Sequence, residues 1–102
     1  MADYFNGLSP AQAERLALLL EELGEAQQAI GKILRHGYES YNPTVPLADR
    51  LSNRQALERE LGDVMAAMGM LSAEGDIDAS EVFRAKERKL LALKPWLHHQ
   101  ER

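Results

Sequence analysis

One long amphipathic helix is predicted by the stretch SPAQAERLALLLEELGEAQQAIGKILRHG, which runs from Ser9 to Gly37. Ser9 is the expected N-cap, because Pro10 suits the first helical position and Gln12 completes an S-x-x-Q capping box. Gly37 is the expected C-cap, since helices often end at a glycine. The apolar residues of the stretch recur at helical spacing on one face: Leu16, Leu19, Leu20, Leu23, Ile30 and Leu34. The fold therefore begins with a long helix that has a leucine-rich face to cover.

A second helix is predicted from Asn53, which can act as its N-cap, to Glu74, with Gly75 ending it. Its expected apolar face consists of Leu57, Leu61, Val64, Met68 and Leu71. Between Val64 and Leu71 the helix is apolar nearly all round, so it needs neighbours on more than one side. A small helical bundle meets this need best by pairing with another copy of itself, which predicts a homodimer or a homotetramer.

A third helix is predicted to open at Asp78, with Glu81 three residues later, and to stop before Pro95. We expect five of its apolar side chains to face inward: Val82, Phe83, Leu90, Leu91 and Leu93. The intervening stretch from Gly37 to Ser52 contains two prolines and two tyrosines and has no sustained periodicity, so we interpret it as a loop. Loops of this length are uncommon unless they are functional or disordered.

The composition predicts an all-α fold in a single domain covering residues 1–102. Alanine and leucine supply 30 residues, whereas valine, isoleucine and threonine supply 7, and this ratio favours helices over strands. We expect a helical bundle that oligomerisation completes, because the long helices expose more apolar surface than three helices can bury alone.

The charge and the apolar pattern exclude several classes of partner. Twelve basic and sixteen acidic residues give a net charge of -4, which argues against binding of long nucleic acid through its phosphates. The longest apolar run, from Val64 to Leu71, is far shorter than the roughly 20 residues that span a bilayer. The start of the chain, MADYFNG, does not resemble a signal peptide, and the chain contains no cysteine. We therefore expect a soluble, cytoplasmic protein that contacts neither membranes nor nucleic acid.

Two acidic clusters are the features that point to chemistry. The first predicted helix contains Glu21, Glu22 and Glu25 in the string EELGE, and the second contains Glu60 and Asp63 in the string ELGD. In each cluster two carboxylates stand three residues apart, so they are neighbours on one helical surface. Their spacing alone leaves two interpretations open, solvated acidic faces or a site for a hard cation such as magnesium. A di-iron site is less consistent with the sequence, because neither cluster has a histidine three residues on.

The pattern EE-x-x-E on one helix and E-x-x-D on the next resembles the all-α nucleotide pyrophosphohydrolases of the MazG type. The resemblance extends from Ser9 to Lys89 and includes the basic string KILRHG at residues 32–37 and the basic third helix around Lys86. It implies hydrolysis of a nucleoside triphosphate between the α and β phosphorus atoms, which yields a monophosphate and pyrophosphate. It also implies a role in control of the nucleotide pool or in removal of unwanted nucleotides.

The same resemblance assigns roles to individual residues. Mg²⁺, or Mn²⁺ in its place, would be held by four carboxylates: Glu22, Glu25, Glu60 and Asp63. Glu21, Glu22 and Glu25 would form the catalytic group, in which Glu21 is either an outer-sphere carboxylate or the base that orients the attacking water. One departure from the family is the interval from Glu25 to Glu60, which is longer than usual and leaves the substrate's identity open. The additional residues fall in the loop, where they would serve as a base-recognition segment or as a lid.

Five basic residues are the predicted substrate contacts: Lys32, Arg35, His36, Lys86 and Lys89. Lys32 follows Glu25 by two turns on nearly the same side of the helix, and its alternative role is an ion pair on a solvated face. Arg35 and His36 would also be favoured at a helix C-terminus by the helix dipole alone. For Tyr38, Tyr41 and Trp96 we expect packing against the bundle rather than stacking on a base.

Two other functions remain compatible with the sequence. The first is a non-catalytic helical interaction module whose acidic face docks a basic partner. The second is a dUTPase-like or nucleotide diphosphatase activity that uses the same carboxylates on a narrower substrate.

Overall fold

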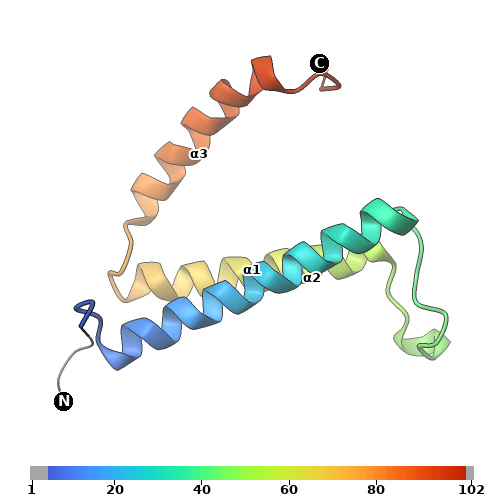
Figure 1. The fold of residues 1–102 in the computed structure, drawn as a ribbon, viewed down its shortest axis with the longest axis horizontal. Helices are drawn as coiled ribbons and strands as arrows, with labels where there is room; N and C mark the ends of the chain where they lie inside the picture. Colours follow the sequence, from blue (N-terminus) through green and yellow to red (C-terminus); the bar gives the residue numbers. More distant parts are fainter. Residues whose placement is uncertain (1–4, 101–102) are drawn as a thin grey trace.

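The computed structural model describes residues 5–100, and these residues form three α-helices and two short 3-10 helices (Figure 1). The helices are α1 (Pro10–His36), η1 (Leu47–Asp49), α2 (Asn53–Ala73), α3 (Ala79–Leu93) and η2 (Lys94–Trp96). The described residues contain no β-strand beyond one isolated bridge between Tyr41 and Ser52. The predicted all-α class is therefore confirmed.

The boundaries of α1 follow the predicted capping residues. The Ser9 hydroxyl oxygen accepts from the Gln12 backbone N–H at 3.1 Å, and the Gln12 side-chain oxygen accepts from the Ser9 backbone N–H at 2.9 Å. At the other end, the Gly37 N–H donates to the Ile33 carbonyl at 2.7 Å. Gly37 has a φ of 88°, a conformation that other residues rarely adopt, so a glycine is needed where the helix ends.

The predicted N-cap of α2 is wrong by one residue. Ser52 is the cap, because its hydroxyl oxygen accepts from the Gln55 N–H and the Gln55 side chain reciprocates at 2.9 Å. The S-x-x-Q pattern from Ser52 to Gln55 marks this start as clearly as the one at Ser9, and it outweighs the capping preference of an isolated asparagine. Asn53 is instead the first helical residue, and its side-chain amide donates to the Gly37 carbonyl at 3.0 Å. The helix ends at Ala73, ahead of Gly75, which has a φ of 77°.

The helices α1 and α2 lie side by side as an antiparallel hairpin (Figure 1). The buried side chains are few and mostly small: Ala26 and Ala29 on α1 with Val64, Ala67 and Leu71 on α2. Alanines at these positions let the two backbones approach closely along their length. The leucine-rich face of α1 is not the face that meets α2, since Leu20 is 73% exposed and Leu34 is 81% exposed.

The connection between α2 and α3 is attached to the start of α1 by an ion pair. The Arg15 guanidinium donates to both carboxylate oxygens of Asp76, at 2.6 and 3.1 Å. Both side chains are largely shielded from solvent. This paired geometry lowers the pKa of Asp76, with the Arg15 hydrogen bond as the main cause. The pair therefore fixes the point from which α3 leaves the hairpin.

The expectation that α3 turns its apolar side chains inward is wrong for the single chain. The helix extends away from the hairpin (Figure 1), and none of its residues, all of which the structure describes, is buried. Phe83 is 57% exposed and Leu91 is 82% exposed, although Leu93 is partly covered. The apolar period identifies which face of a helix avoids water, but it does not say which element covers that face. Within residues 5–100, no helix is both long and apolar enough to cross a bilayer.

Candidate metal centre

Four carboxylates from the two hairpin helices converge on one point. One oxygen from each of Glu22, Glu25, Glu60 and Asp63 belongs to a group whose members all lie within 4.8 Å of one another. The first two come from α1 and the last two from α2. The structure therefore brings together the four residues that the sequence predicts as metal ligands.

The core pattern of the hairpin explains why these carboxylates meet. On α1, Glu22 precedes the buried Ala26 by four residues and Ala29 by seven, so it continues the stripe that faces α2. On α2, Glu60 precedes Val64 by four residues and Ala67 by seven, and it continues the opposing stripe. The two glutamates are consequently carried into the helix interface by the residues that hold it together.

Glu22 and Glu60 each have one carboxylate oxygen that is buried without a hydrogen-bond partner among the described residues. Burial raises the pKa of Glu22 above that of an ordinary glutamate, and the negative charge of Glu25 is the next cause. A hydrogen bond with Glu25 raises the pKa of Glu60, and burial and the charges of Asp63 and Glu22 raise it further. The ionised cluster is therefore short of positive charge.

The basic side chains of the described residues do not supply that charge. Their ion pairs lie elsewhere and join Arg15 to Asp76, Arg54 to Glu39, Arg84 to Glu81 and Lys86 to Glu87. A buried carboxylate group without a counter-charge is costly, whereas an oxygen-only cluster of this kind suits a hard divalent cation. The donor set and the two orphaned oxygens both fit such an ion.

Glu21 stands apart from the four-oxygen group. Its side chain is exposed on α1, and its negative charge contributes to the raised pKa of Glu22. Glu21 is therefore at the solvent edge of the cluster, where a carboxylate can contact water without being a direct ligand.

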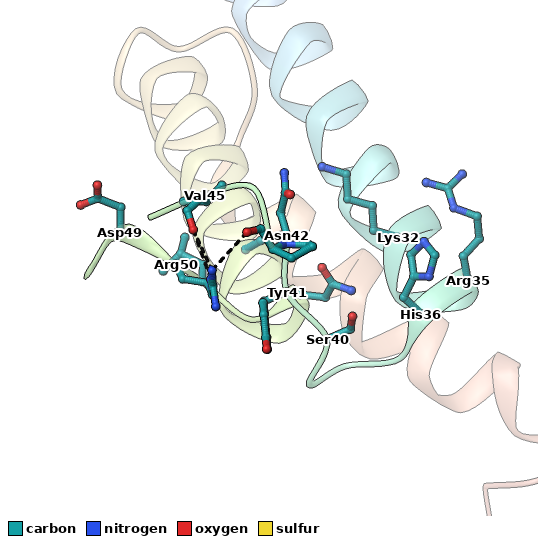
Figure 2. A pocket seen from close by; sticks show the side chains of 13 residues that line it. Lys32, Arg35, His36, Ser40, Tyr41, Asn42, Val45, Asp49 and Arg50 are labelled. Carbon is teal, nitrogen blue, oxygen red and sulfur yellow. Dashed lines mark hydrogen bonds between the residues drawn. The ribbon is translucent and has the colours of Figure 1, made fainter. Parts of the chain in front are cut away.

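Two connected hollows lie beside the cluster, toward the C-terminal end of α1. The smaller has a volume of about 200 Å³, and Glu25, Glu60 and Lys32 are among the residues that line it. The larger has a volume of about 860 Å³ and lies between the end of α1 and the loop of residues 37–52 (Figure 2). Lys32, Asn53 and Ala56 line both hollows, so the two adjoin.

The loop that forms the far wall of the larger hollow is held by its own contacts. The Arg50 guanidinium lies over the Tyr41 ring, 4.5 Å from its centre, and donates to the carbonyls of Val45 and Pro43 at 3.0 and 3.2 Å (Figure 2). The Asn53 N–H donates to the Ser40 carbonyl at 2.8 Å, which joins the loop to the start of α2. The predicted loop is therefore an ordered structure with a defined inner surface.

The predicted substrate contacts divide into two groups. Lys32, Arg35 and His36 line the larger hollow and lie on the α1 side of it (Figure 2). Lys86 and Lys89 are on α3, outside both hollows, and Lys86 lies 3.6 Å from Glu87. Within one chain, α1 brings Lys32 into the hollow that Glu25 and Glu60 line, and Arg35 and His36 into the adjoining hollow, whereas α3 brings neither of its lysines to either.

The aromatic residues follow the expected packing only in part. Tyr38 packs under the Arg54 guanidinium at 4.3 Å, and Tyr41 packs under Arg50 while also lining the larger hollow. Trp96, which we expected to pack against the bundle, is 77% exposed on η2. Like the apolar face of α3, the Trp96 side chain is left largely uncovered by the described residues of one chain.

Sequence reasoning missed Asn42, Arg50 and Asn53 as residues of the site. The pairing of Tyr41 with a later arginine across the loop is a usable signal for Arg50, since arginine stacks readily on tyrosine. Asn42 precedes a proline, which marks a turn but does not indicate a binding surface.

Comparison with known proteins adds one finding. Residues 11–98 match the family described as the MazG nucleotide pyrophosphohydrolase domain. No curated protein and no solved structure gave a match.

Proposed function

Since the chain belongs to the MazG nucleotide pyrophosphohydrolase family, we propose that it is a magnesium-dependent nucleoside triphosphate pyrophosphohydrolase. Its substrate would be a ribo- or deoxynucleoside triphosphate, and its products a nucleoside monophosphate and pyrophosphate. The proposed role is control of the cytoplasmic nucleotide pool or removal of unwanted nucleotides.

The observation that carries this proposal is the group of four carboxylate oxygens within 4.8 Å of one another. Two of these carboxylates, Glu22 and Glu60, have a buried oxygen that lacks a partner among the described residues. A surface used only to dock a basic protein would keep its carboxylates solvated, so the burial favours the enzyme over the acidic interaction module.

Glu22, Glu25, Glu60 and Asp63 are the residues that would hold Mg²⁺, with Mn²⁺ as the alternative ion. A divalent cation bound there would neutralise negative charge on the α- and β-phosphate oxygens. The carboxylates fix its position from two helices that pack directly against each other, so the site is preorganised.

Glu21 is the carboxylate available to take a proton in the proposed reaction. A water oxygen forms a bond to the α phosphorus while the bond from that phosphorus to the α–β bridging oxygen breaks. The proton of that water passes to the exposed Glu21 carboxylate, and pyrophosphate leaves with the electrons of the broken bond. Lys32, which lines the hollow shared with Glu25 and Glu60, offers a cation to the phosphate oxygens.

The proposed assembly is a homodimer or a homotetramer. Its support is the exposed apolar surface of α3, including Phe83 and Leu91, together with Leu20 and Leu34 on the hairpin. A second copy packed on this surface would cover it, and it would provide Lys86 and Lys89 with a route to a neighbouring site.

A panel of the common ribo- and deoxynucleoside triphosphates together with dUTP, incubated with Mg²⁺, tests the proposed function. We expect equimolar pyrophosphate and monophosphate from at least one of them, and a Glu22→Gln control should be inactive. Turnover of dUTP alone would support the narrower dUTPase-like activity. Orthophosphate released directly from a triphosphate would contradict the pyrophosphohydrolase.

A further inference from the structure

One wall of the larger hollow beside the metal centre is the loop of residues 37–52, and the proposed reaction uses none of the loop's side chains. We propose that this hollow, between the end of α1 and the loop of residues 37–52, binds the nucleoside part of the substrate, and that Asn42 and Asn53 read its base. The inference rests on the proposed function, because it assigns a place to the part of the nucleotide that does not react. A volume of about 860 Å³ lies within the range of small-ligand pockets, roughly 300 to 1,000 Å³.

The position of the hollow matches the order of groups in a nucleotide. Lys32 follows Glu25 by seven residues, which places it about 10 Å farther along α1 at 1.5 Å per residue. The smaller hollow joins Glu25 and Glu60 to Lys32, and the larger one continues from Lys32 to the loop. An α-phosphate bound between the carboxylates and Lys32 would therefore direct the sugar and base attached to it into the larger hollow.

The two walls of the hollow differ in charge. Lys32, Arg35 and His36 make the wall on α1 basic, whereas the facing loop offers the polar Tyr41 and Asn42 and the acidic Asp49 (Figure 2). The Arg50 guanidinium is also on the loop side, but the carbonyls of Val45 and Pro43 and the Tyr41 ring already engage it. The loop wall is therefore the less basic of the two, and it is the wall that we expect the base to contact.

Two amide side chains leave hydrogen-bonding groups available in this hollow. The Asn42 side-chain oxygen accepts from both the N–H and the hydroxyl of Thr44, at 3.0 and 2.7 Å. Its NH₂ group has no acceptor among residues 5–100. Asn53 has the opposite arrangement, because its NH₂ donates to the Gly37 carbonyl at 3.0 Å while its side-chain oxygen has no donor within the described chain. Among the polar side chains that line the hollow, these two amides thus offer one donor group and one acceptor, and a nucleobase edge pairs with both kinds of group.

The variant Asn42→Asp tests this assignment directly, because it keeps the oxygen that accepts from Thr44 and removes the NH₂ donors. We expect kcat/KM to fall about tenfold for the base that uses the donor and less for the others, so the order of preference among nucleotides changes. Asn42→Ser repeats the test without adding a charge. Thr44→Val is the matched control, since it removes one loop hydrogen bond and leaves the Asn42 NH₂ in place. Thr44→Val should therefore leave the order of preference among nucleotides unchanged.

Inorganic tripolyphosphate separates nucleoside contacts from phosphate contacts. As a competitive inhibitor, tripolyphosphate should bind the Asn42→Ser variant as tightly as the unmodified protein. Lys32→Met should weaken the binding of tripolyphosphate and of nucleotides alike. The inference is overturned if folded Asn42→Asp and Asn42→Ser leave every nucleotide ratio unchanged, or if Asn42→Ser weakens tripolyphosphate by the same factor as nucleotides.

A failure of the proposed function would be recognised separately, as the absence of pyrophosphate from every nucleotide with the unmodified protein. Binding of nucleoside monophosphates, followed by amide chemical shifts, then tests the hollow without turnover. Shifts concentrated in residues 38–53 would support the inference, and shifts absent from that segment would overturn it.

Discussion

Glu22 on α1 and Glu60 on α2 face each other across the hairpin, and each has one buried carboxylate oxygen without a partner among the described residues. Two like charges in this position repel, and neither is fully hydrated. The hairpin is therefore under electrostatic strain at the point where its function is proposed to lie. A bound divalent cation would relieve that strain and stabilise the folded chain.

This relationship predicts how stability depends on pH in the absence of metal. The pKa values of Glu22 and Glu60 are raised, so the folded state binds more protons than the unfolded state at mildly acidic pH. The free energy of unfolding should therefore fall as pH rises from the ordinary glutamate pKa through the raised values. Melting curves recorded with a chelator from about pH 4, near the ordinary glutamate pKa, up to about pH 8 measure this.

Glu60→Gln is the matched variant for that prediction, because it removes one charge and keeps the shape. Without metal it should melt at a higher temperature than the unmodified protein, and its advantage should grow as pH rises. With Mg²⁺ bound, the unmodified protein should have the higher melting temperature, since it alone keeps all four ligands. A variant that is less stable than the unmodified protein at pH 8 under chelation would be inconsistent with a repulsive cluster.

Activity should depend strongly on the four ligands. Glu22→Gln or Glu60→Gln should lower kcat by about 100-fold or more, the scale typical of losing a group that stabilises the transition state. Gln27→Glu on the exposed side of α1 is a control that changes charge away from the cluster. Pyrophosphate release at saturating Mg²⁺ is the measurement. Full turnover by either ligand variant would show that the ligands are misassigned.

Glu21 can be distinguished from the ligands by separating catalysis from metal affinity. If Glu21 takes the proton of the attacking water, Glu21→Gln should lower kcat by about 100-fold or more and leave the Mg²⁺ concentration for half-maximal activity unchanged. A higher Mg²⁺ requirement with the same loss of kcat would instead indicate an outer-sphere contact to the ion.

The Arg15–Asp76 pair should contribute to stability but not to catalysis. Asp76→Ala leaves a shielded guanidinium without its partner, so the melting temperature should drop by several degrees. The pair lowers the pKa of Asp76, and the stability it provides should disappear as pH falls below the ordinary aspartate range through that lowered pKa. Asp49→Ala, an exposed loop position, is the control. Equal melting temperatures for both variants at pH 7 would contradict this account.

The proposed assembly gives a prediction about size. Leu91→Glu places a charge on the exposed apolar face of α3, and it should convert a dimer or tetramer into a smaller species. Light scattering after size-exclusion chromatography reports the mass. Lys94→Glu, a charge change beyond the end of α3, should leave the mass unaltered. An unmodified protein that is a monomer at all concentrations would rule out the assembly.

The sequence predicted the helices and the pairing of carboxylates within each acidic cluster, because local rules determine both, whereas the metal-ligand roles came from the family resemblance and stay a prediction. The capping box at Ser9 and the glycine at 37 define α1, and the i, i+3 spacing puts each carboxylate pair on one surface. The error at the start of α2, Asn53 for Ser52 as the N-cap, came from reading a single capping residue where a four-residue pattern was present.

What could not be predicted depends on contacts between distant segments. The leucine face of α1 is its most apolar face, but the alanine stripe packs on α2 because small side chains allow the helices to come close. The hollow beside the loop depends on the Arg50 and Tyr41 contact and on the Asn53 bond to Gly37, neither of which follows from periodicity. One chain leaves the apolar face of α3 exposed, and the periodicity of α3 does not say which element covers that face.

Titration of the metal-free protein with Mn²⁺ at pH 7, followed by calorimetry or by the electron paramagnetic resonance of free Mn²⁺, tests the metal centre most directly. The unmodified protein should bind Mn²⁺ saturably, Mg²⁺ should compete, and Glu22→Gln and Glu60→Gln should each lose most of the affinity while remaining folded. Absence of saturable binding, or equal binding by all three proteins, would contradict the assignment of these carboxylates as a metal site.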